Sequence, residues 1–367
     1  MIKILFTAIL VIHGLIHLMG FLKAFRLAQI SQLTLAISRP AGLVWLAAAV
    51  LFFVTALSYG LGTRWWWILG GIGFVVSQIL VVSAWSDAKY GTIVSVIVLV
   101  GVVLGCASWS FSGTSRRELK ALLAHVASER VTVTEGSLMK LPVAVQTWLR
   151  RSNVIGKEIA RTVHLKQKGS LRTSRDGSWM PFEAEQWFTT DKPGFLWEAE
   201  VAAAPGISLA GRDTYCDGRG HMVIKIMSLF GVADAQGKET DQGALIRFLA
   251  ETSWFPSSAL SPYIEWEGID SLSAKATMRY GDVTGSGIFT FNERGDMVRF
   301  EAQRYYERNG SYSLETWVVE TLPDGTGAFE GVRMPLRCAV SWILEDVPFT
   351  WLTLEITDLT YDRQGPP

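Results

Sequence analysis

The chain has 367 residues, and its 34 basic and 34 acidic side chains leave it without net charge. The charge is divided unevenly: residues 1–113 carry six Lys and Arg against a single acidic residue, Asp87, which leaves 28 basic and 33 acidic residues, a net of −5, for the remainder. A mildly acidic region without a basic run argues against a nucleic-acid-binding surface, because contacts to phosphate dominate that affinity.

Four long stretches near the N-terminus contain no Asp, Glu, Lys or Arg. They cover residues 4–21, 41–61, 65–85 and 91–111. About 20 apolar residues in a helix cross a hydrocarbon layer of about 30 Å, and backbone groups in lipid must be paired within the segment. The sequence therefore predicts a four-span transmembrane domain over residues 1–112, and not a cleaved signal peptide followed by a secreted protein.

The first span contains two histidines, His13 and His17, which are four residues apart and so share one helix face. They are weak candidates for metal or haem ligands, because the other three histidines lie outside the spans. We favour hydrogen bonding inside the helix bundle, and predict no metal and no cofactor.

Positive charges flanking the spans predict the orientation of the protein. The loops after the first and third spans carry more of them than the amino end and the middle loop, with Lys23, Arg26, Arg39 and Lys89 against Lys3 and Arg64. We therefore expect loops one and three to be cytoplasmic in a bacterial inner membrane, and the C-terminal domain to be extracytoplasmic. Gly101 and Gly105 in the fourth span form a small-xxx-small pattern, which offers a contact for a homo-oligomer.

Residues 113–156 are predicted to be a helical linker. Leucines and a valine at helical spacing indicate a helix from Ser115 to Arg130, and a second short helix covers Leu141 to Arg151. Ser137 and Lys140 match a serine acyl-transfer motif, but the partner motifs of that chemistry are missing and the pair lies in a polar stretch.

From residue 157 to 367 apolar and polar residues alternate with a period of two, which predicts an antiparallel β domain with tight turns. The predicted strands are 159–172, 179–189, 195–202, 221–226, 264–268, 272–280, 287–292, 297–306, 312–321, 336–344 and 350–361. One amphipathic helix, from Asp241 to Trp254, interrupts them and must pack on the sheet. The fold class is therefore a four-helix transmembrane region plus an α+β domain, a large half-barrel-like antiparallel sheet packed on one or two helices.

Several motifs together resemble a bacterial, membrane-anchored family of unknown function. They are residues 179–186, 211–218, 241–243, 254–256 and the pair Arg304-Tyr305. A fainter similarity, carried by residues 192–197, the turn at Asp217-Gly218, the helix before residues 254–256 and residues 289–295, links the chain to periplasmic lipoprotein carriers. This similarity implies an antiparallel half-barrel closed by helices around a hydrophobic cavity.

Charged residues of the β domain form a candidate site with its aromatic residues. The candidate ligand-binding residues are Glu183, Glu185, Trp187, Trp197, Arg212, Asp213, Asp241, Phe248, Glu251, Trp254 and Arg304. Carboxylates with arginines can orient a ligand or catalyse a reaction, and the alternative is a set of salt bridges that anchor turns and the helix to the sheet. Cys216 and Cys338 either pair or remain buried thiols.

These observations predict a multi-pass membrane protein whose extracytoplasmic β domain binds a lipid, an acyl chain or another hydrophobic envelope component. The partners are then the lipid bilayer and such a molecule, without nucleic acid. A non-enzymatic scaffold with a solid core and a hydrolase that uses the carboxylates and arginines remain as alternatives.

Overall fold

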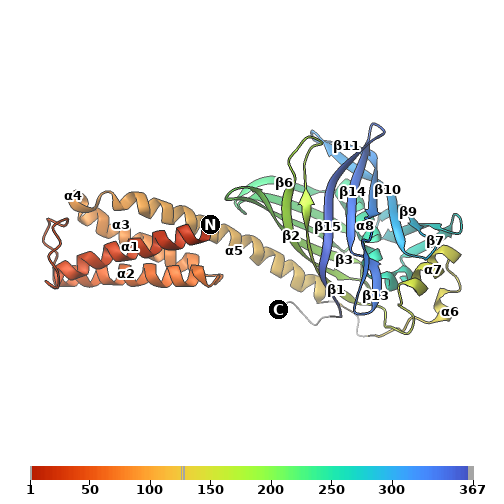
Figure 1. Ribbon diagram of the computed structural model, residues 1–367, viewed down its shortest axis with the longest axis horizontal. Coiled ribbons are helices and arrows are strands. Elements are labelled where there is room, and N and C mark those ends of the chain that lie inside the picture. Colours follow the sequence, from red (N-terminus) through yellow and green to blue (C-terminus); the bar gives the residue numbers. More distant parts are fainter. Residues whose placement is uncertain (1, 125, 127–128, 363–367) are drawn as a thin grey trace. The chain divides into compact units, whose positions relative to one another are not determined.

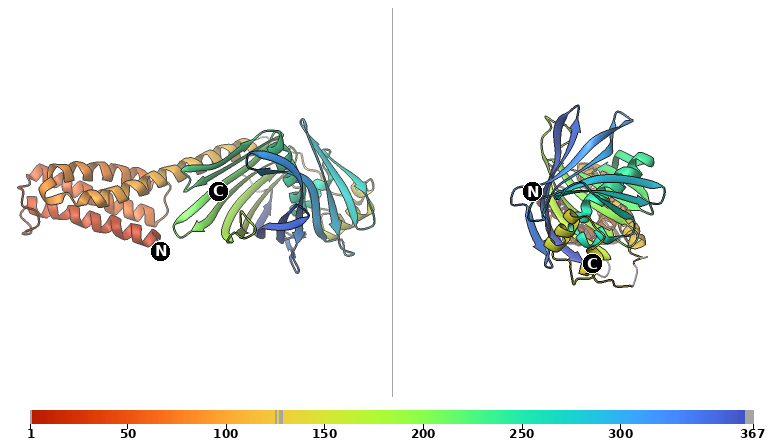
Figure 2. Two further views of the ribbon diagram at one scale, coloured as in Figure 1. Left: turned by 90° about the horizontal axis from the view of Figure 1, so that it is seen from above. Right: turned by 90° about the vertical axis from the view of Figure 1, so that its right-hand side faces the viewer.

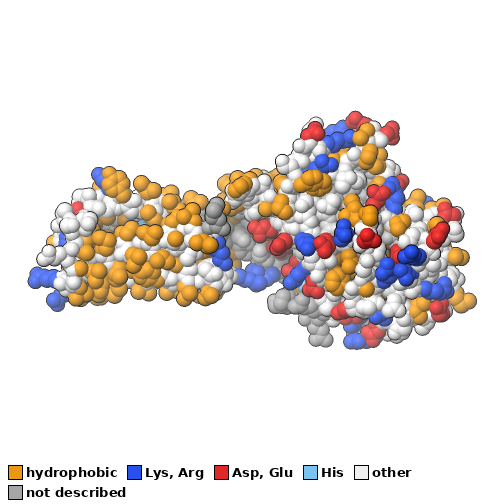
Figure 3. Space-filling model, in the orientation of Figure 1, with side chains coloured by type: hydrophobic (Ala, Val, Ile, Leu, Met, Phe, Trp, Pro, Cys, Tyr) orange, Lys and Arg blue, Asp and Glu red, His pale blue; other side chains and the backbone are white. Residues whose placement is uncertain are grey.

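The computed structural model describes residues 2–124, 126 and 129–362, which form two compact units. The helical unit comprises the described residues up to Gly113 together with Met227–Leu229, and the sheet unit comprises Thr114–Ile226 and the described residues from Phe230 onward. On the face that Figure 3 shows, apolar side chains cover most of the helical unit, whereas charged side chains of both signs are interspersed over the sheet unit.

Four helices of the first unit are long and apolar enough to cross a membrane, which confirms the predicted apolar helices. They are α1 (Ile2–Ala24), α2 (Arg39–Gly60), α3 (Trp66–Ser83) and α5 (Gly91–Leu123), with the single turn α4 (Trp85–Ala88) between the last two. The helix predicted to begin at Ser115 is the continuation of α5, because one glycine, Gly113, costs about 1 kcal/mol but does not break the hydrogen-bond ladder.

Buried polar groups and glycines connect the helices inside this unit. Nε2 of His13 and Nε2 of His17 lie 3.0 and 2.8 Å from the Ser77 hydroxyl, so both histidines take part in hydrogen bonds within the bundle. A Cβ on Gly101 would come within 2.4 Å of the Phe6 ring, and one on Gly105 within 2.5 Å of Trp66. The small-residue face of α5 is therefore occupied by side chains of the same chain, and the predicted oligomer contact does not follow from it.

Among the described residues, the sheet unit contains a 13-stranded antiparallel sheet, a separate hairpin, the three α-helices that follow α5 and two 3-10 turns. The strands are β1 (Thr162–Leu171), β2 (Met180–Thr189), β3 (Gly194–Ala204), β4 (Ile207–Cys216), β5 (Arg219–Ile226), β6 (Phe230–Gln236), β7 (Ile264–Gly268), β8 (Ser273–Tyr280), β9 (Val283–Phe291), β10 (Met297–Arg308), β11 (Ser311–Thr321), β14 (Arg337–Leu344) and β15 (Val347–Tyr361). Their order is β6-β5-β4-β3-β2-β1-β15-β14-β11-β10-β9-β8-β7. The sheet thus consists of two series of antiparallel neighbours, which are joined where the last strand, β15, pairs with the first, β1. The hairpin pairs β12 (Thr326–Phe329) with β13 (Val332–Pro335).

The sequence does not predict four of these strands, β4, β6, β12 and β13. β12 and β13 have four residues each, too few for a period of two to be visible. In β4 the alternation of apolar and polar residues is interrupted by two small residues, Ala210 and Gly211, and two charged ones, Arg212 and Asp213. The segment before the Asp217-Gly218 turn therefore resembles a loop in the sequence.

Helix α8 (Lys238–Glu251) packs on the inner side of the curved sheet, as Figures 1 and 2 show. Two 3-10 turns follow it, η1 (Thr252–Trp254) and η2 (Pro256–Leu260). The short helices α6 (Glu135–Leu138) and α7 (Val143–Arg151) also contribute buried side chains to the main core, so the stretch that we predict as a linker is part of the packed domain. In α6, Ser137 forms a capping box with Thr134, a structural role for the serine of the acyl-transfer motif.

Candidate functional site

The inner face of strands β1 to β5 is divided into three zones along the strands. The first is a filled aromatic core, in which Phe188, Phe195 and Tyr215 lie opposite one another in register. Phe248 of α8 packs over them, with ring centroids 6.2 Å from Phe188 and 6.3 Å from Tyr215, and Phe255 lies 4.8 Å from Phe188. All five rings are buried, so this end of the strands is a packed core.

The second zone is a network of hydrogen-bonded polar side chains, which we call the polar belt. Its members are Gln167, Gln186, Trp197, Asp213, Arg247 and Glu251. Arg247 of α8 donates to Asp213 at 2.6 Å and to Glu251 at 2.8 Å. The Gln186 amide donates to Glu251 at 2.9 Å, and the Trp197 indole donates to Gln167 at 3.0 Å.

Within the polar belt, burial and ion pairing shift the pKa values of the charged side chains in opposite directions. Burial alone lowers the pKa of Arg247, but Glu251 and Asp213 outweigh it and raise this pKa above its ordinary value. Burial raises the pKa of Glu251, and Arg247 opposes this shift without cancelling it. The two carboxylates are therefore engaged by one arginine, which also lies over the rings of Phe195 and Trp197 at 4.9 and 5.0 Å.

The third zone, beyond the belt, is apolar and partly open. Residues directly opposite in register share a face, so the inner face continues from Phe182 to Val201 and Leu209, and from there to Ile226 and Phe230. We call this zone the apolar strip; it comprises Leu171, Met180, Phe182, Val201, Ile207, Leu209, Ile226, Phe230 and Leu352. Phe182 and Val201 are buried at its floor, whereas Ile207 is 47% and Phe230 63% exposed.

Arg304 enters this concave side from β10. Its guanidinium carbon lies 4.9 Å from the ring centre of Trp317 and 5.8 Å from that of Trp342. Burial lowers the pKa of Arg304 to about 10, although Asp213 and Glu251 are near enough to oppose the shift. Within the part of the chain that the structure describes, Arg304 has no ion pair, and its buried Nε atom has no hydrogen-bond acceptor.

The sequence-predicted site residues fall into separate groups. Trp197, Asp213, Phe248, Glu251 and Arg304 lie on the inner face and meet in or beside the polar belt.

Four other predicted residues lie on the outer face of the sheet. Trp187 stacks on His164 at 4.1 Å, and Glu185 contacts the same histidine at 2.5 Å. Arg212 pairs with Glu118 of α5 at 3.0 Å, and Glu183 is exposed. Neighbouring residues of a strand point to opposite faces, so Arg212 and Asp213 cannot serve the same site.

The last two predicted residues have structural contacts. Asp241 accepts from the backbone N–H of Gly220 at 2.7 Å and from Arg219 at 3.0 Å, which ties the first turn of α8 to β5. Trp254 is buried in the core, 6.4 Å from Phe188. The carboxylates Glu183, Asp213 and Asp241, which the hydrolase alternative requires together, thus have three different surroundings.

Sequence reasoning missed Arg247, Gln167 and Gln186, which complete the belt. Arg247 carried a signal, because it lies four residues before Glu251 on one helix and the two form an i,i+4 ion pair. The glutamines carried none, since only the strand register brings them to the helix.

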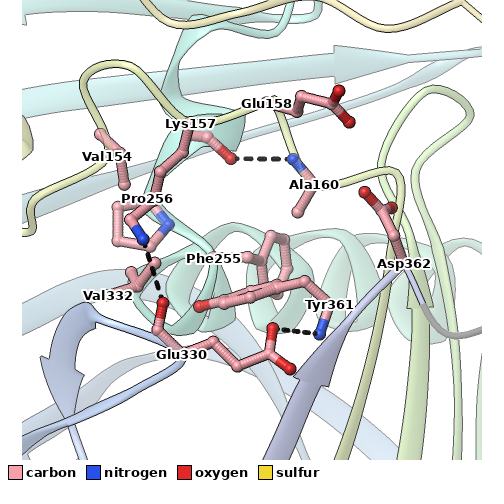
Figure 4. A pocket seen from close by; sticks show the side chains of 11 residues that line it. Val154, Lys157, Glu158, Ala160, Phe255, Pro256, Glu330, Val332, Tyr361 and Asp362 are labelled. Carbon is pink, nitrogen blue, oxygen red and sulfur yellow. Dashed lines mark hydrogen bonds between the residues drawn. The ribbon is translucent and has the colours of Figure 1, made fainter.

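A small pocket lined by both polar and apolar residues lies apart from the belt, near η2 and the end of β15 (Figure 4). Its volume is about 180 Å³, and residues around it include Lys157, Ser257, Glu330 and Tyr361. Lys157 donates to the Glu330 carbonyl at 3.0 Å, and the Glu330 carboxylate accepts from the Tyr361 backbone N–H at 3.2 Å. Most polar groups at its rim are thus already engaged with one another.

Cys216 is exposed and Cys338 is buried, and the two are not bonded to each other. Burial raises the pKa of the Cys338 thiol to about 12, so this group remains protonated. Across residues 2–124, 126 and 129–362, no three His, Cys, Asp or Glu side chains come together in a way that could hold a metal ion.

The fold is a half-barrel, in which a curved antiparallel sheet packs around one helix, α8. Residues 131–354 match DUF6544, a family of unknown function, and the chain belongs to that family, which confirms the predicted membership. No curated protein matches the sequence significantly.

Two solved structures illustrate the likeness at the level of the fold. A DUF1329 family protein from Desulfovibrio piger is 10% identical, with a TM-score of 0.33 over 61% of this chain and 94% of the other. A domain from Vibrio parahaemolyticus, provisionally described as an outer membrane lipoprotein-sorting protein, is 8% identical, with a TM-score of 0.31 over 60% of this chain and 91% of the other.

Proposed function

We propose that this protein is a membrane-anchored module of the bacterial cell envelope that binds a lipid, an acyl chain or another hydrophobic envelope component on the concave side of its sheet. One observation carries the proposal: the inner face of β1 to β5 ends in the apolar strip, whose outer members are exposed although the rest of that face is filled or hydrogen-bonded. Contiguous exposed apolar surface on a concave face is typical of a site that another apolar molecule covers.

The arrangement favours an amphipathic molecule. An apolar tail gains free energy along the strip, at about 25 cal/mol for each Å² removed from water. The polar belt behind the strip already satisfies its own hydrogen bonds, so it limits how deep the tail reaches and leaves the aromatic core undisturbed.

The four apolar helices and the charges around them support the location. We place the helical unit in the bacterial inner membrane with the C-terminal domain on the extracytoplasmic side, because the first and third loops carry four basic residues against two in the amino end and the middle loop. An alkaline phosphatase fused after residue 367 should then be active, since this enzyme folds only outside the cytoplasm. An inactive fusion beside an active cytoplasmic reporter at the same position would reverse the orientation.

Ligand binding is tested on the full chain in detergent. Mass spectrometry of extracts should find a lipid that co-purifies, and delipidated protein should take up a fluorescent fatty acid. Leu209→Glu places a charge in the strip and should weaken uptake about tenfold or more, because desolvating a carboxylate against a tail is unfavourable. Ile288→Glu, on the outer face of β9 at 38% exposure, is the matched control and should bind as the wild type does.

The scaffold alternative has one observation in its favour. β6 is an edge strand, and Phe230 and Val232 on it are exposed, so a partner could add a strand there. If the wild type takes up no lipid, and Val232→Pro abolishes the capture of a protein partner, this alternative replaces the lipid-binding proposal.

A further inference from the structure

The concave side of the sheet holds two half-buried arginines whose surroundings differ. Arg247 has two carboxylates and a glutamine within hydrogen-bonding distance. Arg304 interacts with the same two carboxylates only through long-range electrostatics. Asp213 and Glu251 form their ion pairs with Arg247 instead.

No other carboxylate of the described chain satisfies Arg304. Glu315 lies directly opposite it on β11, but the Glu315 carboxylate accepts from the Ser313 hydroxyl at 2.8 Å and makes no ion pair with Arg304. A buried guanidinium without an anion is unfavourable, and folded proteins retain few such groups without a reason.

The surroundings of Arg304 have the form of a built site. The guanidinium lies over the rings of two tryptophans that are opposite each other in register, and α8 approaches it with a glycine, Gly243. A Cβ at residue 243 would come within 3.2 Å of Arg304 Nε, so a larger residue would press on this side chain. Tyr306, two residues along β10 on the same face, packs edge-on against Trp342 at 5.0 Å and continues the apolar lining.

We infer that Arg304 is the anion-binding residue of the concave site, and that the ligand is an amphiphile with an anionic head, a carboxylate or a phosphate, attached to an apolar tail. This inference rests on the proposed function and specifies its ligand class. The head lies against the guanidinium, beside the rings of Trp317 and Trp342, and the tail extends over the apolar strip. A guanidinium matches the two oxygens of a carboxylate or phosphate with parallel N–H donors, which a lysine cannot do.

The test compares an acid with its neutral ester on the full chain in detergent. cis-Parinaric acid and its methyl ester have the same fluorescent tail and differ only in the charge of the head. Wild type should bind the acid about tenfold or more tightly than the ester, the factor expected for a buried charge-assisted hydrogen bond. Arg304→Gln should remove this preference with little effect on the ester, and Arg304→Lys should restore part of it.

Two further variants keep the result interpretable. Arg304→Met, which is similar in length and apolar, shows by its melting temperature whether the uncharged site folds. Arg299→Gln removes an arginine from the outer face of the same strand, where it pairs with Glu301 and Glu320, and should leave both affinities unchanged.

The outcomes separate the two proposals. Equal binding of acid and ester by the wild type, or an equal loss of both in Arg304→Gln, overturns the anionic head and leaves the hydrophobic site in place. Failure of the wild type to bind either probe overturns the proposed function itself. Displacement of the bound acid by phosphatidylglycerol vesicles but not by phosphatidylcholine vesicles would assign the head to a phospholipid, whereas displacement by neither would assign it to a free fatty acid.

Discussion

Arg247 and Arg304 should respond in opposite ways to the loss of their charge. Arg247→Met leaves Asp213 and Glu251 buried without a partner, and we expect it to lower the free energy of unfolding by about 3 to 5 kcal/mol. Arg304→Met removes a buried charge that has no partner among the described residues, so the melting temperature should stay or rise. Thermal unfolding followed by tryptophan fluorescence compares the two, and equal destabilisation would contradict the contrast between a paired and an unpaired arginine.

The ion pairs of Asp296 with Arg151 and Arg333 connect the turn before β10 to α7 and β13, and we expect them to break at acidic pH. Burial raises its pKa, but hydrogen bonds from Arg333 at 2.6 Å and Arg151 at 3.2 Å outweigh this effect and hold the pKa below 3.8. A lowered folded pKa stabilises the protein above the unfolded pKa and is lost as the pH falls through the folded value. The melting temperature should therefore fall more steeply below about pH 4 in the wild type than in Asp296→Asn. If the melting temperatures of wild type and Asp296→Asn fell equally with pH, the arginines would not hold this carboxylate ionised.

At the scale of single elements, α7 packs on the core through four buried residues, of which Trp148 is the largest. Trp148 is 1% exposed, and its ring packs against Phe291 at 5.4 Å and Phe289 at 5.8 Å. Trp148→Ala should lower the free energy of unfolding by about 3 to 5 kcal/mol, whereas Val143→Ala, at a side chain that is 69% exposed, should change it by less than about 0.5 kcal/mol. Chemical unfolding curves measure both, and a small effect of Trp148→Ala would mean that α7 is a peripheral linker.

The strand elements also show which parts of the site the sequence could predict. Alternation in β10 correctly puts Arg304 on the face of Phe300 and Ala302, because a period of two is a local property. In β4 the same rule would have separated Arg212 from Asp213, but the strand itself was not recognised. The meeting of Asp213, Arg247 and Gln186 depends on the register of strands and on where α8 crosses the sheet, and neither is encoded by any local pattern.

At the scale of the whole molecule, the sheet unit has its own core. Its buried cluster runs from Val133 to Leu359 and draws on α6, α7, α8 and the sheet. A chain that begins at Thr114 should therefore remain soluble and give a circular dichroism spectrum dominated by β-structure, with the same near-ultraviolet bands as the full protein. A mainly helical or disordered spectrum would show that the helical unit is needed for folding.

Because the concave face is divided into a filled core, the polar belt and the open apolar strip, the length of the strip should determine which hydrocarbon chain length the protein prefers. Along the strands the strip covers three residues, from Met180 to Phe182 on β2 and from Ile207 to Leu209 on β4, or roughly 10 Å at about 3.3 Å per residue. A short hydrocarbon would be covered completely, whereas a much longer one must project past the hairpin ends into solvent or a second apolar phase. Selectivity would then show as a plateau, with affinity rising by each added methylene until the strip is full and staying level beyond that length.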